Sequence, residues 1–245
     1  MTLVLSIRHP EAIVMAADSR KTIFSTTVHH ETLEPIGATT VAFGKATKLF
    51  VLPGSGCVSM WGDITRAEKH ISAFLHGLQG KMAGPDELAN QIEDFLKHKA
   101  HADYGDDLGF HIGGFRSDGQ HALFHVFWGM ERGPHIVPDD NPRDFKKHDH
   151  SSPLALYNGQ NAIADSMFQF LFSLEQEVGI VTWIANHTIA KTVQFADFVL
   201  RYVAKIDPTV GGQINVAVIY PGNRVKLVKN ATEVAIPIAI LQDLL

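Results

Sequence analysis

The first twenty residues constrain the fold more than any other part of the chain. Two apolar runs, residues 2–7 and 12–17, flank a short polar break at residues 8–11, and this pattern predicts a β-hairpin. Antiparallel pairing of the two runs would fold the chain back so that Asp18 lies beside Thr2. The sequence therefore predicts a hairpin whose open end carries a hydroxyl and a carboxylate side by side.

Thr2 directly follows the initiator methionine, which gives this position a chemical meaning. If Met1 is removed, the threonine carries a hydroxyl and a free α-amine, which together form a complete nucleophile and base. The ordinary pKa of an α-amine lies close to neutrality, as a general base requires. Asp18, next to a buried cation, would stay ionised and orient that cation. The structural alternative is an edge-strand threonine and a turn aspartate.

Composition excludes several classes of protein. Of the 245 residues, 45% are hydrophobic and 19% charged, so a large core is expected and disorder is not. The net charge of −5, without a block rich in Lys and Arg, argues against a nucleic-acid partner. No apolar run is long enough to span a membrane and no signal peptide is recognisable. The lone Cys57 suits a reducing compartment, so a cytoplasmic protein is expected.

Histidine is abundant, with 14 residues, and two clusters invite a metal interpretation. These clusters are residues 29–30 and 148–150. Both lie in polar stretches, and no matching Cys/His set completes a metal site. Solvated loops are the favoured interpretation, so neither a metal nor an organic cofactor is expected.

Apolar periodicity and turn residues predict the remaining elements. Strands are expected over residues 48–52, 57–61, 110–115, 121–128, 154–157, 213–220 and 224–228. Helices are expected over residues 64–78, from Pro85 onward, over 161–177 and over 186–205, with Asn186 as an N-cap. Residues 21–40 are expected to form a long loop or a weak strand excursion, and residues 132–153 a loop. This order predicts an α+β fold with two packed antiparallel sheets and a helix pair on each outer face, in a single domain over 1–245.

The opening resembles the proteasome β-subunit family of N-terminal-nucleophile hydrolases. In that family the mature chain starts with threonine, and Asp-Ser-Arg begins sixteen positions later, as Asp18 does after Thr2. The resemblance is strongest to the bacterial branches, such as HslV, Anbu and the betaproteobacterial proteasome homologue. It implies the four-layer αββα sandwich of the N-terminal-nucleophile hydrolase fold over nearly the whole chain.

The resemblance also implies a lysine and an oxyanion-hole glycine. The family lysine precedes a short apolar strand, and the glycine follows fourteen positions later. Lys45 and Lys48 both precede such a strand, but only Lys48 has a glycine, Gly62, at that distance. A cation near the Thr2 hydroxyl would favour the alkoxide, and the Gly62 N–H would donate to the oxyanion.

Four further residues are candidates for substrate binding, two of them near Asp18 and two on the register of Lys48 and Gly62. Ser19 and Thr22 would line a cleft through their backbone. Met60 and Ile64 would shape an apolar pocket for the residue that precedes the cleaved bond.

Two late segments depart in part from the family pattern. Asn158 stands where the family has a serine near the nucleophile, Asp207 matches a family aspartate, and Val210 replaces a second serine. Asn158 can still hydrogen-bond around the terminal amine, whereas Val210 cannot. The interval from Asp18 to Lys48, thirty residues, is also longer than is usual in the family.

These residues together predict a threonine-type peptidase that acts on peptides or unfolded proteins. The resemblance implies a homo-oligomeric double ring that encloses the sites, with an ATP-dependent unfoldase as a further candidate partner. The alternatives are a catalytically inactive scaffold subunit of the same fold and an N-terminal hydrolase of small amides. The missing serines favour the scaffold, whereas the coexistence of Thr2, Asp18, Lys48 and Gly62 favours the enzyme.

Overall fold

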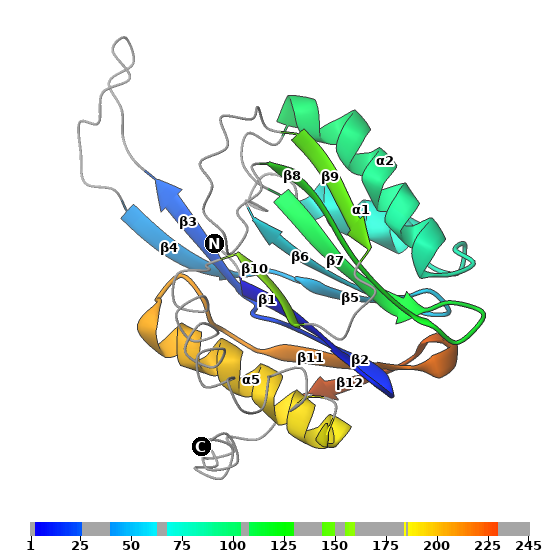
Figure 1. Cartoon of the computed structure of the whole chain (residues 1–245). Helices are drawn as coiled ribbons and strands as arrows, with labels where there is room; N and C mark the ends of the chain where they lie inside the picture. Colours follow the sequence, from blue (N-terminus) through cyan, green and yellow to red (C-terminus); the bar gives the residue numbers. More distant parts are fainter. Residues whose placement is uncertain are drawn as a thin grey trace.

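The computed structural model describes residues 3–25, 40–62, 68–103, 108–129, 144–149, 155–159, 184 and 186–229. These residues form an α+β fold in which helices flank antiparallel sheets (Figure 1). The predicted positions Thr2 and Ile64 lie outside the described residues, as does the helix expected over 161–177.

The first sheet contains the predicted N-terminal hairpin. Its strand order is β10-β1-β2-β11-β12. The strands are β1 (Leu3–His9), β2 (Ala12–Ala17), β10 (Ala155–Gly159), β11 (Asn215–Tyr220) and β12 (Arg224–Lys229). In the hairpin Val4 lies opposite Ala17, so the predicted pairing of the two apolar runs is confirmed. β1 and β2 are apolar on both faces because both faces are covered, as in other buried strands.

The second sheet has the strand order β5-β6-β7-β8-β9. Its strands are β5 (Leu49–Leu52), β6 (Gly56–Gly62), β7 (Leu108–Phe115), β8 (His121–Gly129) and β9 (Asp144–Asp149). β9 corrects the loop that was expected over residues 132–153. Its sequence, Asp-Phe-Lys-Lys-His-Asp, lacks an apolar run, and the strand is defined by its ladder with β8 at the sheet edge.

A two-stranded ribbon stands apart from both sheets, where a loop or weak excursion was expected. It consists of β3 (Arg20–Ser25) and β4 (Thr40–Lys45), paired from Arg20 opposite Lys45 onward. Figure 1 shows the ribbon extending away from the body of the molecule. Both strands of the ribbon lie between Asp18 and Lys48 in the sequence, within the thirty-residue interval that separates these two residues.

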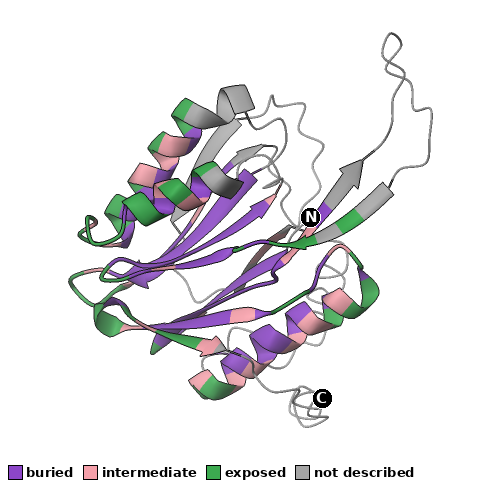
Figure 2. Ribbon diagram, turned by 180° about the vertical axis from the view of Figure 1, so that it is seen from behind, coloured by how far each residue is buried: buried purple, intermediate pink, exposed green. Residues whose placement is uncertain are grey.

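Three α-helices cover the outer faces of the two sheets in the described part of the chain. α5 (Ile189–Ile206) packs on the first sheet, whereas α1 (Glu68–Gly77) and α2 (Pro85–Asp103) pack on the second (Figure 1). A third apolar cluster, which includes Val4, Met15 and Trp61, fills the space between the sheets. Burial is accordingly concentrated on the strands, and the helices expose their outer faces (Figure 2).

The start of α5 differs from the expected N-cap at Asn186. The cap is Thr188, whose hydroxyl accepts a hydrogen bond from the Lys191 N–H at 3.3 Å. Serine and threonine satisfy this position as well as asparagine does, and the sequence offered both side chains within three residues. None of the described helices has the length and apolar character needed to cross a membrane.

Candidate active site

The Asp18 carboxylate lies at the open end of the hairpin and accepts four hydrogen bonds. Its Oδ1 accepts from the Leu3 N–H at 2.9 Å and from Lys48 Nζ at 2.9 Å. Its Oδ2 accepts from the N–H groups of Arg20 and Gly211, each at 3.1 Å. Four donors on one buried carboxylate fix its orientation and connect the start of β1, the lysine, Arg20 and the loop after α5 to a single group.

Lys48, rather than Lys45, supplies the buried cation. Both side chains of the Lys48–Asp18 ion pair are 0% exposed, and Lys48 Nζ also donates to the Arg20 carbonyl. Lys45 ends β4 with an exposed side chain. The backbone of Lys48 is anchored as well, because its carbonyl accepts from the Met60 N–H at 2.9 Å. The lysine therefore has a defined position next to β5 and β6.

Leu3 is the described residue closest in sequence to Thr2. Its carbonyl accepts from the Asp18 N–H at 3.3 Å, in addition to its own donation to the carboxylate. Both the N–H and the carbonyl of Leu3 are thus hydrogen-bonded to Asp18.

Asp207 organises the loop that follows α5. It forms the C-cap of that helix, and its Oδ1 accepts from Thr209 N at 2.7 Å and from Thr209 Oγ1 at 2.6 Å. The Thr209 carbonyl in turn accepts from Thr22 Oγ1 at 3.1 Å. The side chains of Asp207 and Thr22, two of the predicted site residues, therefore both hydrogen-bond to this loop.

Two glycines let this loop approach Asp18. Gly211 and Gly212 have φ values of +139° and +74°, in the region that favours glycine. A Cβ at Gly212 would lie 2.8 Å from Ser19 Oγ, and one at Gly211 would lie 3.0 Å from the Arg20 guanidinium. Arg20 also donates to the Pro208 carbonyl at 2.6 Å. The positive φ angles and the short distances to the Ser19 and Arg20 side chains together favour glycine at both positions.

Ser19 is fully engaged with its own chain. Its N–H donates to the Gly211 carbonyl at 3.1 Å, its carbonyl accepts from Ala46 N at 2.9 Å, and its hydroxyl accepts from Gln213 N at 2.8 Å. The backbone that was expected to line a cleft is therefore used to join β3, β4 and the loop after α5.

Gly62 ends β6 with a φ of +99°, a conformation that favours glycine. It lies opposite Leu108 in the register of the second sheet. β6 therefore carries both Met60, whose N–H binds the Lys48 carbonyl, and Gly62, two residues further on.

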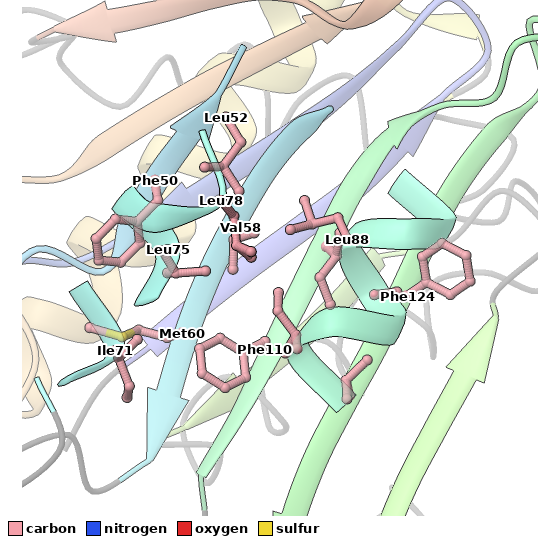
Figure 3. Close-up of a cluster of buried hydrophobic side chains, with 14 of the residues drawn as sticks. Phe50, Leu52, Val58, Met60, Ile71, Leu75, Leu78, Leu88, Phe110 and Phe124 are labelled. Atoms are coloured by element: carbon pink, nitrogen blue, oxygen red, sulfur yellow. The ribbon is translucent and has the colours of Figure 1, made fainter. Parts of the chain in front are cut away.

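Met60 is placed in the core rather than on an open wall. Its side chain is fully buried in the cluster beneath α1 and α2, near Ile71 and Phe110 (Figure 3). Alternation along β6 accounts for this placement, since Met60 and Val58 face the helices while Cys57 and Trp61 face the first sheet.

Asn158 is joined to a histidine that the sequence did not single out. It lies on β10 opposite Val4, and its Oδ1 lies 2.7 Å from His111 Nε2, within hydrogen-bond distance. His111 Nδ1 lies 3.0 Å from Ser6 Oγ. The only sequence signal for His111 was that it is a polar residue within an apolar strand. A histidine buried in the core without a functional role gives the same pattern.

Cys57, the single cysteine of the chain, is a second potential nucleophile. It is fully buried between the sheets, and this burial raises the pKa of its thiol. A thiol held in its neutral form is a poor nucleophile. Cys57 is therefore a core residue.

Metal-binding side chains do not gather in the described part of the chain. No three His, Cys, Asp or Glu residues within it are grouped as a metal site requires. The clusters at residues 29–30 and 148–150 fall outside the residues whose side chains are described.

The comparisons with known proteins agree with this architecture. Anbu from Hyphomicrobium sp. strain MC1 superposes with a TM-score of 0.58 and 14% identity, over 99% of this chain and 95% of that one. Anbu (ancestral beta-subunit) from Yersinia bercovieri gives 0.56 and 12%, over 99% and 94%. The fold is shared with Anbu. The predicted resemblance to Anbu, one of the bacterial branches named above, is thus confirmed at the level of the fold.

No family model matches the sequence, and no curated protein matches it either. With 12–14% identity to the Anbu structures, the likeness describes the backbone arrangement. The chemistry of this chain therefore rests on its own residues.

Proposed function

We propose that this chain is a threonine-type peptidase subunit in which Thr2, freed from Met1, is the nucleophile. The observation that carries the proposal is the buried Asp18–Lys48 pair, whose carboxylate binds the N–H of Leu3. Burying an ion pair is costly unless further hydrogen bonds satisfy it, and here they do. A cation and a carboxylate fixed one residue from the chain start match the needs of a terminal nucleophile.

In the proposed mechanism the α-amine of Thr2 takes the proton of Oγ through a water molecule. Oγ attacks the peptide carbonyl, and the resulting oxyanion accepts from the Gly62 N–H. The Lys48 ammonium stabilises the negative charge that develops at Oγ. The protonated α-amine gives its proton to the leaving amine, the C–N bond breaks, and the acyl group remains on Thr2 Oγ as an ester. Water then hydrolyses that ester and restores the free hydroxyl. No cofactor enters these steps.

The proposed substrates are peptides and unfolded proteins. Because the nucleophile would attack any chain that reached it, we place the sites inside a homo-oligomeric double ring in the cytoplasm, with an ATP-dependent unfoldase as a candidate partner. The Anbu-like fold supports a single domain over 1–245 arranged as a four-layer αββα sandwich. The second helix on the side of α5 would come from residues 161–177.

Hydrolysis assays test the proposal against its alternatives. The processed chain should release a fluorophore from a peptide amide. Thr2→Ala and Lys48→Met should abolish this activity, whereas Lys45→Met, with its exposed side chain, should retain it. Hydrolysis of small amides alone would point to a narrower amidase. A processed chain that cleaves neither substrate would contradict the proposal and favour the scaffold subunit.

A further inference from the structure

A buried polar bridge crosses the apolar space between the two sheets. It runs from Ser6 on β1 to His111 on β7 and back to Asn158 on β10, over 3.0 Å and 2.7 Å. Ser6 and His111 are 0% exposed. A histidine in such a place needs partners on both ring nitrogens, and the first sheet supplies both of them.

The contact through Asn158 Oδ1 determines the donor and acceptor roles along the bridge. Because Oδ1 is an acceptor, His111 Nε2 must carry the hydrogen of this bond. In the neutral imidazole Nδ1 is then an acceptor, which the Ser6 hydroxyl satisfies by donating to it. The oxygen branch of Asn158 is thus directed to His111, and the NH2 branch is directed elsewhere.

The register places Asn158 near the chain start. It lies opposite Val4, and side chains two residues apart on a strand share a face. β1 begins at Leu3, which lies opposite Gly159, so Asn158 pairs within one residue of the start of this strand. Thr2, the nucleophile of the proposed mechanism, directly precedes Leu3 in the sequence.

We propose that His111 is a positioning residue that holds the NH2 group of Asn158 toward the Thr2 nucleophile. There the NH2 group donates to the water that carries the proton from Oγ to the α-amine. His111 would touch neither substrate nor reacting atoms, and it acts through Asn158. The inference rests on the proposed function and adds to it a residue from the opposite sheet.

The test measures how fast a peptide epoxyketone alkylates Thr2 at saturating reagent, with intact mass confirming Met1 removal in every variant. His111→Leu should slow the reaction about tenfold without changing the apparent affinity for the reagent, since only the proton path is disturbed. His111→Gln, whose amide can donate to Asn158, should recover most of the rate. Ser59→Ala is the matched control, because Ser59 is a buried neighbour opposite His111 in the register and should react at the wild-type rate.

The decisive comparison is the double variant His111→Leu/Asn158→Ala. If His111 acts through Asn158, the double variant reacts no more slowly than Asn158→Ala alone. If the rate losses of His111→Leu and Asn158→Ala multiply in the double variant, the two residues act independently and the inference is wrong. A wild-type rate for His111→Leu would also overturn it. If His111→Leu does not fold, Ser6→Ala replaces it, with a loss of about threefold that disappears in the Asn158→Ala background. A wild-type chain that never reacts overturns the proposed function, and this inference with it.

Discussion

Asp18 and Lys48 form an ion pair with no solvent exposure on either side chain. Two charges in the interior cost several kcal/mol of desolvation each, so such a pair is tolerated only when its remaining hydrogen-bonding capacity is satisfied. The Asp18 carboxylate meets this condition with three backbone N–H groups in addition to the ammonium. The pair therefore links local stability to the geometry of the proposed site.

Replacing the carboxylate should separate these two roles. Asp18→Asn puts an NH2 group where two donors now bind and leaves the Lys48 charge buried without its partner. We expect a loss of about 3–5 kcal/mol in the free energy of unfolding, measured by urea denaturation. The double variant Asp18→Asn/Lys48→Met should regain part of this stability but no reactivity. A single variant as stable as the wild type, or a double variant that still reacts, would contradict the account.

His121 should make the stability of the chain depend on pH. Burial lowers the pKa of this histidine, and the nearby Arg8 cation lowers it further. The unfolded state therefore binds the proton more readily than the folded state. The contribution is complete above the ordinary pKa of 6.5 and is lost as the pH falls toward the lowered pKa of the folded state. Urea midpoints at pH 8 and pH 5 should differ more in the wild type than in His121→Gln, and equal differences would refute this.

At the scale of elements, the loop after α5 is hydrogen-bonded to the residues that follow the hairpin. It reaches Asp18 through the Gly211 N–H and reaches Ser19 through the Gln213 N–H. Both contacts depend on positive φ angles at Gly211 and Gly212. A side chain introduced at Gly211 or Gly212 should therefore displace Asp18 or Ser19 without contacting the reacting groups.

A pair of glycine variants tests this dependence. Gly212 and Gly222 share a φ of +74°, but a Cβ at Gly212 would meet Ser19 Oγ at 2.8 Å, whereas nothing lies within 4 Å of one at Gly222. Gly222→Ala should cost about 1–2 kcal/mol for the backbone conformation alone. Gly212→Ala should cost about 1–3 kcal/mol more, because Ser19 must move. Equal losses in thermal or urea unfolding would show that the loop does not depend on this contact.

The elements differ in how far the sequence could predict them. The N-terminal hairpin was predictable because two apolar runs meet at a short polar break. The choice of Lys48 depended on the family resemblance, which implies a glycine fourteen positions after the lysine. β9 was missed because its polar sequence carries no strand pattern and it pairs only at the edge of the sheet. His111 was missed because its partners, Ser6 and Asn158, are 105 and 47 residues away in the sequence.

At the scale of the whole molecule, the two sheets and their covering helices agree with the Anbu-like fold. We expect the purified chain to assemble into a homo-oligomer several times the mass of one subunit, because an unprotected threonine nucleophile requires enclosure. Light scattering coupled to size exclusion measures this mass directly. A strictly monomeric chain that still hydrolyses peptides would contradict the enclosed assembly while leaving the chemistry intact.

The central claim is that a processed Thr2 is a competent nucleophile beside the Asp18–Lys48 pair. The most direct measurement is the intact mass of the purified chain before and after incubation with a peptide epoxyketone, which reacts with N-terminal threonine. The account predicts loss of one methionine, followed by a single stoichiometric adduct that fragment masses assign to Thr2 and that Thr2→Ala lacks. A processed chain that forms no adduct, or one that keeps Met1 and still hydrolyses peptides, would contradict it.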